Sequence, residues 1–119
     1  MAMTVGVENF KHFFNGRPPR EFIYEDDQCV AFDEEDRPQA PVHFLVVPKK
    51  VIPRLSDASP DDEKMLGRLL NVARRLANEK GLNEKGFRVV INDGVNGGQT
   101  IGQFYVQVFG GRQMGWPFG

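Results

Sequence analysis

Hydrophobic and polar residues follow two different periods along this chain, and the changes of period predict the order of its elements. Five segments have the length and composition of β-strands: 21–25, 29–32, 43–47, 87–92 and 101–109. In the first of them Phe22 and Tyr24 alternate with polar residues, which predicts a half-buried strand. The third is almost entirely apolar between Pro41 and Pro48, as a central strand is. The last two are joined by a short glycine-rich turn at 93–98 and should therefore pair antiparallel.

The central part of the chain follows the helical period instead. Ser59 is a natural N-cap, Pro60 suits the first helical position, and Gly81 suits the residue that follows a helix. Apolar residues between them repeat at three- and four-residue steps: Met65, Leu66, Leu69, Leu70, Ala73, Leu76 and Ala77. Phe10 and Phe13 also have helical spacing, which predicts a short N-terminal helix. About five antiparallel strands with one long and one short helix indicate an α+β domain.

Composition narrows the class of protein. The chain has 119 residues, 40% of them hydrophobic and 26% charged, which predicts one folded domain over 10–119 after a flexible N-terminus at 1–9. The net charge of −1 disfavours nucleic acid as a partner, and no apolar run is long enough to cross a membrane. A single cysteine, Cys29, and the absence of a secretory signal pattern predict a cytoplasmic location, with the nucleus as a second compartment.

The last predicted strand carries the most informative side chains. Alternation places Gln103, Tyr105 and Gln107 on one face of this strand, whereas Phe104, Val106 and Val108 share the other. The apolar set should face the core. The polar set lies beside the glycine-rich turn, where the two together have the composition of an anion pocket. The same pattern also suits an ordinary solvent-facing hairpin, and strand alternation alone leaves both interpretations open.

Several motifs in register resemble the histidine triad (HIT) superfamily, in particular its HINT branch. The C-terminal half carries Asn92-Asp93-Gly94, then Gly97-Gly98-Gln99-Thr100, the alternating strand, and Gly110-Gly111-Arg112-Gln113-Met114-Gly115-Trp116-Pro117. The first half carries Tyr24-Glu25-Asp26-Asp27, Ala31-Phe32, and the run from Pro38 to Lys50 in the same order as the family. The resemblance covers the chain from Phe10 onward.

This resemblance implies a HIT-like fold, a dimer, and a site for purine nucleoside monophosphates, on which many members hydrolyse phosphoramidates. Some members of the family bind zinc, but we expect no cofactor here. The implied roles are as follows: Phe10, Phe13, Phe32 and Ile101 around the purine, Glu34 on the ribose hydroxyls, and Asn92, Gln99 and Thr100, beside Gly98, Tyr105 and Gln107, near the phosphate. Arg112, Gln113 and Trp116 match segments that the family uses between subunits.

The departure from the family lies at its defining residues. The alternating histidines of the last strand are replaced by Gln103, Tyr105 and Gln107, with Tyr105 at the position of the nucleophile. The chain has two histidines: His43 matches a supporting residue of the family, and His12 matches nothing catalytic. A phenol has a reference pKa of about 10 and needs a base, which an amide cannot provide. Losing an activated nucleophile and its proton shuttle costs on the order of 10⁴–10⁶ in rate.

Three functions follow in order of preference. The first is a catalytically inactive, HINT-like binder of purine nucleotides. The second is an interaction protein that pairs with itself or with an active HINT paralogue. The third is a residual phosphoramidate hydrolase that uses Tyr105. The acidic loop at 33–36 is one residue longer than is usual in the family, and its charge disfavours phosphate if it faces the site. We expect no metal, since the imidazole ligands of a zinc site are mostly missing.

Overall fold

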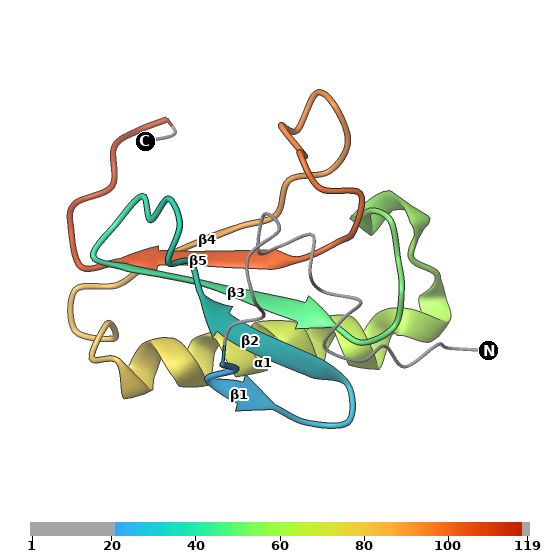
Figure 1. The fold of residues 1–119 in the computed structure, drawn as a ribbon, viewed down its shortest axis with the longest axis horizontal. Helices are drawn as coiled ribbons and strands as arrows, with labels where there is room; N and C mark the ends of the chain where they lie inside the picture. The colour runs from blue at the N-terminus through green and yellow to red at the C-terminus, as the bar shows by residue number, and fades with distance from the viewer. Residues whose placement is uncertain (1–20, 118–119) are drawn as a thin grey trace.

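The computed structural model describes residues 21–117, so the predicted N-terminal helix around Phe10 and Phe13 and the segment 1–9 lie outside the described part of the chain. Five strands form one sheet: β1 (Tyr24–Glu25), β2 (Cys29–Asp33), β3 (Val42–Pro48), β4 (Arg88–Val90) and β5 (Val106–Gly110). Their order across the sheet is β1-β2-β3-β5-β4, and every neighbouring pair is antiparallel (Figure 1). The predicted antiparallel sheet and the pairing of the last two strands are therefore confirmed.

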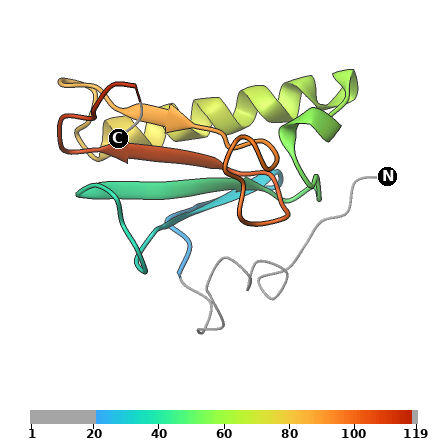
Figure 2. The ribbon, with the colours of Figure 1, turned by 90° about the horizontal axis from the view of Figure 1, so that it is seen from above.

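One long helix, α1 (Glu63–Glu79), covers one face of this sheet (Figure 2). Two short 3₁₀ turns precede it: η2 (Leu55–Asp57) and η3 (Pro60–Asp62). Pro60 begins the second turn, and the Asp62 carboxylate accepts the backbone N–H of Ser59 at 2.9 Å, so the predicted start is confirmed with one 3₁₀ turn in front of the α-helix. At the other end Gly81 has a φ of +79°, as a glycine after a helix does.

The main core lies between α1 and the sheet. It contains the inner face of the helix together with Phe44 and Val46 of β3 and Val106 and Val108 of β5. Phe104, Val106 and Val108 thus share the core side, as alternation predicted. No helix in the range 21–117 is long and apolar enough to cross a membrane.

The opposite face of the sheet carries a second, smaller apolar cluster. Val30, Phe32, Leu45 and Val47 are buried there, and Tyr105 packs against them. No helix within residues 21–117 covers this face (Figure 2). The polar side chains that alternate with the core residues of β3 and β5 therefore lie on the side of the sheet away from α1.

The last strand is shorter than the alternation predicted. It begins at Val106 instead of residue 101, because β3 ends at Pro48, which has no N–H to continue the ladder, and because Phe104 donates its N–H to Ile52 at 2.8 Å. The chain from 101 to 105 thus lies outside the sheet, before the first residue of β5. The first and fourth strands are also shorter than predicted, at two and three residues.

Candidate functional site

A cleft of about 970 Å³ opens on the uncovered face of the sheet. Its lining comes from the β2–β3 loop, from β3, from the glycine-rich loop after β4, and from β5. The lining residues are Glu34, Asp36, Arg37, Gln39, His43, Leu45, Asn92, Gly98, Thr100, Ile101, Tyr105 and Gln107. Eight of the residues predicted for the site therefore come together: Glu34, His43, Asn92, Gly98, Thr100, Ile101, Tyr105 and Gln107.

The remaining predicted residues lie elsewhere. Phe32 is fully buried in the small apolar cluster, where it supports the sheet instead of lining the cleft. Gln99 and Gln103 are not among the lining residues, and Phe10 and Phe13 fall outside the described range. The strand alternation that grouped Gln103 with Tyr105 fails because the chain has already left the sheet at this point.

A chain of hydrogen bonds runs along one side of the cleft. Gln39 donates its backbone N–H to Nδ1 of His43 at 3.1 Å, so Nε2 of this imidazole carries the hydrogen and donates to Oε1 of Gln107 at 2.8 Å. Gln107 in turn donates from Nε2 to Oδ1 of Asn92 at 3.0 Å, and Asn92 donates from Nδ2 to the carbonyl of Gly97 at 2.7 Å. Each group donates to the next in the same direction.

These contacts fix the state of His43. His43 is 7% exposed, and the centroid of its ring lies 4.2 Å from that of the Phe109 ring. Because Nδ1 accepts and Nε2 donates, the imidazole is neutral and both of its nitrogens are engaged. His43 therefore holds Gln107 in position and has no free nitrogen with which to take a proton from a ligand.

Tyr105 occupies the floor of the cleft and is partly buried. Burial raises the pKa of its phenol, and the negative charge of Glu34 raises this pKa further, while a hydrogen bond with Thr100 acts in the opposite direction. The phenol is therefore protonated at neutral pH. Among the lining residues in the range 21–117, the imidazole of His43 has both nitrogens hydrogen-bonded, and a carboxylate such as that of Glu34 is a far weaker base than a phenolate.

Two other polar groups bear on the chemistry of this region. Cys29 lies fully buried on the helix side of the sheet, where desolvation raises the pKa of its thiol to about 12, so this cysteine is no nucleophile. Gln103 is 6% exposed, and its Nε2 is buried with no hydrogen-bond partner in the described part of the chain. An unpaired buried amide costs about 1–3 kcal/mol of stability.

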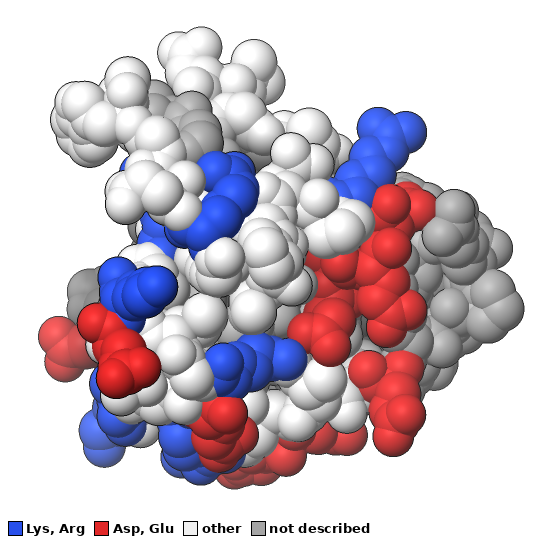
Figure 3. Space-filling model, turned by 90° about the vertical axis from the view of Figure 1, so that its left-hand side faces the viewer, with Lys and Arg blue, Asp and Glu red and all other residues white. Residues whose placement is uncertain are grey.

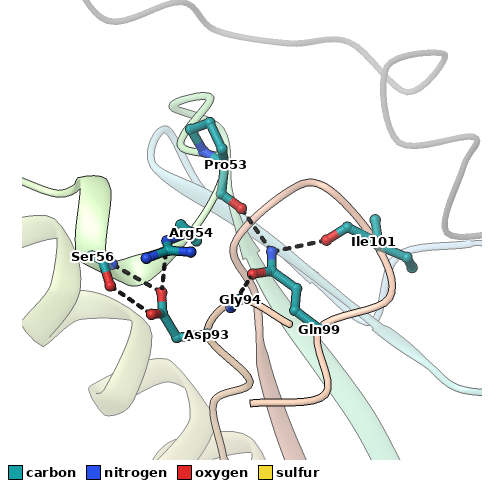
Figure 4. A network of polar contacts seen from close by, with 7 residues as sticks. All are labelled: Pro53, Arg54, Ser56, Asp93, Gly94, Gln99 and Ile101. Atoms are coloured by element: carbon teal, nitrogen blue, oxygen red, sulfur yellow. Dashed lines mark hydrogen bonds and ion pairs between the residues drawn. The ribbon is translucent and has the colours of Figure 1, made fainter. Parts of the chain in front are cut away.

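Hydrogen bonds made by Gln99 hold the glycine-rich loop in its conformation. Gln99 donates from Nε2 to the carbonyls of Pro53 and Ile101 at 2.7 and 2.9 Å, and its Oε1 accepts the N–H of Gly94 at 2.8 Å (Figure 4). Its backbone N–H is also engaged, by the carbonyl of Gly94 at 3.0 Å. The two hydrogens of the Gln99 amide are thus committed to the loop, whereas Thr100 and Ile101 reach the cleft.

Asp93 anchors the start of the same loop, and sequence reasoning gave it no role. Its carboxylate accepts the N–H and the hydroxyl of Ser56 at 3.0 and 2.5 Å and lies 3.7 Å from Nε of Arg54 (Figure 4). The hydrogen bonds with Ser56 hold the pKa of Asp93 below its usual value. The sequence gives little warning of this contact, because Ser56 lies 37 residues before Asp93 along the chain.

The β2–β3 loop brings acidic groups to the cleft. Acidic side chains gather on the end of the molecule shown in Figure 3. Glu34 accepts the backbone N–H groups of Asp36 and Arg37 on its Oε1 at 2.9 and 3.1 Å, and its Oε2 has no hydrogen bond within residues 21–117. Glu34 and Asp36 line the cleft, whereas Glu35 is exposed. The longer loop therefore faces the site in part, a point that the sequence left open.

Metal ligands are not grouped anywhere in the described range. No three side chains of His, Cys, Asp or Glu in residues 21–117 lie in an arrangement that could hold a metal ion. The donors beside His43 are amides, and both imidazole nitrogens are hydrogen-bonded. The residues present do not fit a zinc site of the kind some HIT proteins have.

The predicted subunit-contact residues lie around the end of β5. Arg112 donates from Nε and Nη2 to the carbonyl of Gln39 at 3.1 and 2.9 Å, which ties this segment to the β2–β3 loop. Gln113 is exposed, and Trp116 is 89% exposed. Their role between subunits stays a prediction.

Comparisons with known proteins agree with this arrangement. The model of the HIT domain matches residues 15–114. An uncharacterized HIT-like protein from Synechocystis sp. is 46% identical over 101 residues, covering 85% of this chain and 87% of that protein. The crystal structure of a HIT family hydrolase from Legionella pneumophila is 38% identical with a TM-score of 0.83, covering 96% and 100% of the two chains. A histidine triad protein from Clostridium difficile is 34% identical with a TM-score of 0.80, covering 91% and 92%. The chain belongs to the HIT domain family.

Proposed function

We propose that this HIT protein binds a purine nucleoside monophosphate in the cleft over β3 and β5 and does not hydrolyse it. One observation carries the proposal: the described residues form a polar-lined cleft, while the group at the nucleophile position is a phenol of raised pKa with no free imidazole nitrogen beside it in residues 21–117. The assignment to the HINT branch is part of this proposal and rests on the motifs quoted above.

The polar groups suit binding more than reaction. Oε2 of Glu34 has no hydrogen bond within residues 21–117 and could accept ribose hydroxyls, and the hydroxyls of Thr100 and Tyr105 lie in the cleft as uncharged polar groups. Gln107 stands at the last histidine position, where its amide oxygen and nitrogen are held by His43 and Asn92. An amide neither gains nor loses a proton near neutral pH, so it offers no general acid for a leaving group.

Calorimetric titration with AMP, GMP and adenosine tests binding. We expect micromolar dissociation constants for at least one of them, together with a gain in unfolding free energy of roughly 2.7 kcal/mol when the ligand exceeds its dissociation constant a hundredfold. Absence of heat and of stabilisation up to millimolar ligand would refute the binding function.

Turnover of an adenosine phosphoramidate tests inactivity. We expect no release of the amine above the uncatalysed rate. Tyr105→Phe removes the phenolic oxygen at the site, and Tyr24→Phe removes the only other phenolic oxygen of the chain, on the distant strand β1. Turnover by the unmodified protein that persists in Tyr24→Phe and disappears in Tyr105→Phe would show that the chain is a hydrolase with altered chemistry.

A second candidate function is pairing with another HIT chain. Strand β4 lies at the edge of the sheet with Val89 exposed, and an apolar cleft of about 620 Å³ lies between this strand and the residues around Met114. An uncovered edge strand offers unpaired backbone groups to a partner. Sedimentation of the protein alone, and after mixing with a HIT paralogue that has the three histidines, distinguishes a homodimer from a mixed dimer; a monomer in both samples contradicts this function.

A further inference from the structure

The charged groups of the cleft come from one short loop. Three of the lining residues in the range 21–117 carry a formal charge, namely Glu34, Asp36 and Arg37. Two carboxylates with a single guanidinium leave the cleft acidic, which opposes an anionic ligand. Within the described part of the cleft, Arg37 is therefore the residue whose charge favours a nucleotide over the bare nucleoside.

The neutral polar residues of the cleft do not replace a positive charge as a partner for phosphate. His43, Asn92 and Gln107 donate to one another and to the carbonyl of Gly97, so a donor of each is committed within the protein. The remaining hydroxyls of Thr100 and Tyr105 are uncharged, and Tyr105 lies in the negative field of Glu34. Neutral donors contribute about half as much as a charged donor to a phosphate oxygen.

The backbone at Arg37 is anchored on both sides. Its N–H donates to Oε1 of Glu34 at 3.1 Å, and its carbonyl accepts from Nε2 of Gln39 at 3.0 Å. Gln39 is held in turn by the guanidinium of Arg112. The guanidinium of Arg37 makes no ion pair or hydrogen bond with any other residue in the range 21–117, and the side chain is exposed at the cleft mouth. A fixed backbone thus presents an uncommitted cation.

We propose that Arg37 determines the specificity of the cleft for an anionic ligand, by pairing with the 5′-phosphate of a nucleoside monophosphate. This inference rests on the nucleotide binding proposed above. It assigns to an arginine of the β2–β3 loop the positive charge that Tyr105 and Gln107 cannot provide. A planar guanidinium suits this task because it offers paired N–H donors to phosphate oxygens.

Titrations of AMP and adenosine into the unmodified protein, Arg37→Ala, Arg37→Lys and Arg74→Ala test the proposal. Arg74→Ala is the matched control, since Arg74 is an exposed arginine on α1, which covers the other face of the sheet. In Arg37→Ala we expect AMP to bind about tenfold more weakly and adenosine to bind unchanged. Arg37→Lys should lose less, because it keeps the charge, and Arg74→Ala should lose nothing. Equal melting temperatures establish that the variants are folded.

Salt provides an independent measurement. Raising the ionic strength from about 0.01 to 0.15 M shortens the screening length from about 30 to 8 Å, so the preference of the unmodified protein for AMP should fall. In Arg37→Ala this preference should not fall, because only the repulsion by Glu34 and Asp36 is left to be screened. Equal losses of AMP and adenosine affinity in Arg37→Ala, or no loss of either, overturn the role of Arg37. Adenosine binding as tight as AMP binding in the unmodified protein overturns it as well and leaves nucleoside binding intact. No binding of either ligand by the unmodified protein overturns both proposals.

Discussion

Replacing Gln107 by leucine removes the central amide of the hydrogen-bond chain and keeps a side chain of similar size. The Nε2–H of His43 would lose its acceptor at 2.8 Å in a residue that is 7% exposed. A buried donor left unpaired costs about 1–3 kcal/mol. Oδ1 of Asn92 would lose its donor too, but this residue is only half-buried and water can replace the lost contact at a small cost. We expect the unfolding free energy to fall by about 2 kcal/mol.

Urea denaturation followed by circular dichroism measures this change. With a urea dependence of about 1–2 kcal/mol per molar for a domain of this size, the midpoint should fall by roughly 1–2 M. Gln113→Leu is the matched control, because Gln113 is exposed and its amide donates only to the carbonyl of the next residue. That variant should change stability by about 0.5 kcal/mol or less. Equal midpoints for the two variants would refute the claim that the chain through Gln107 supports the sheet.

Three further predictions concern acid stability, a buried amide and catalysis. The hydrogen bond with Lys50, and after it the hydrogen bond with the backbone of Ser59, holds the pKa of Asp62 below its usual value. The contribution of Asp62 to the unfolding free energy is therefore complete above the reference pKa of about 4, and it is lost as the pH falls through the lower pKa of the folded state. Asp62→Asn should therefore be less stable than the unmodified protein at pH 7 and equal to it near pH 2 in thermal melts; a constant difference contradicts this. Gln103→Leu should raise the unfolding free energy by about 1 kcal/mol, because it removes the unpaired Nε2, and a loss in urea denaturation would show that this amide has a partner. Tyr105→His combined with Gln107→His should raise phosphoramidate turnover at least about 100-fold over Tyr105→His alone if proton transfer is what the cleft lacks, and equal rates would contradict that reason.

The sequence predicted the parts of the fold that depend on local pattern. The apolar run of β3 between two prolines and the stripe between Ser59 and Gly81 both specify a single arrangement, and the structure has each of them. The resemblance to the HIT family located most of the lining of the cleft, including Tyr105 and Gln107.

The parts that sequence reasoning missed depend on contacts between distant segments. Alternation extended the last strand to residue 101, but the N–H of Phe104 pairs with Ile52 far back in the chain, which takes Gln103 out of the polar row. Arg37 was overlooked because a single arginine in an acidic loop has no pattern of its own. Its position becomes informative only when Glu34 and Gln39 are seen to fix the backbone at the cleft mouth.

The uniform direction of the chain from Gln39 to Gly97 has a consequence for proton movement. A histidine can exchange its donor and acceptor nitrogens, so a row of imidazoles can pass a proton along and be restored afterwards. An amide cannot, because its oxygen only accepts and its nitrogen only donates. With Gln107 and Asn92 in the row and a backbone N–H at its start, the direction is set by covalent structure. The row therefore cannot carry a proton along the sheet to or from the cleft. It does connect the β2–β3 loop to the glycine-rich loop by an unbroken series of hydrogen bonds.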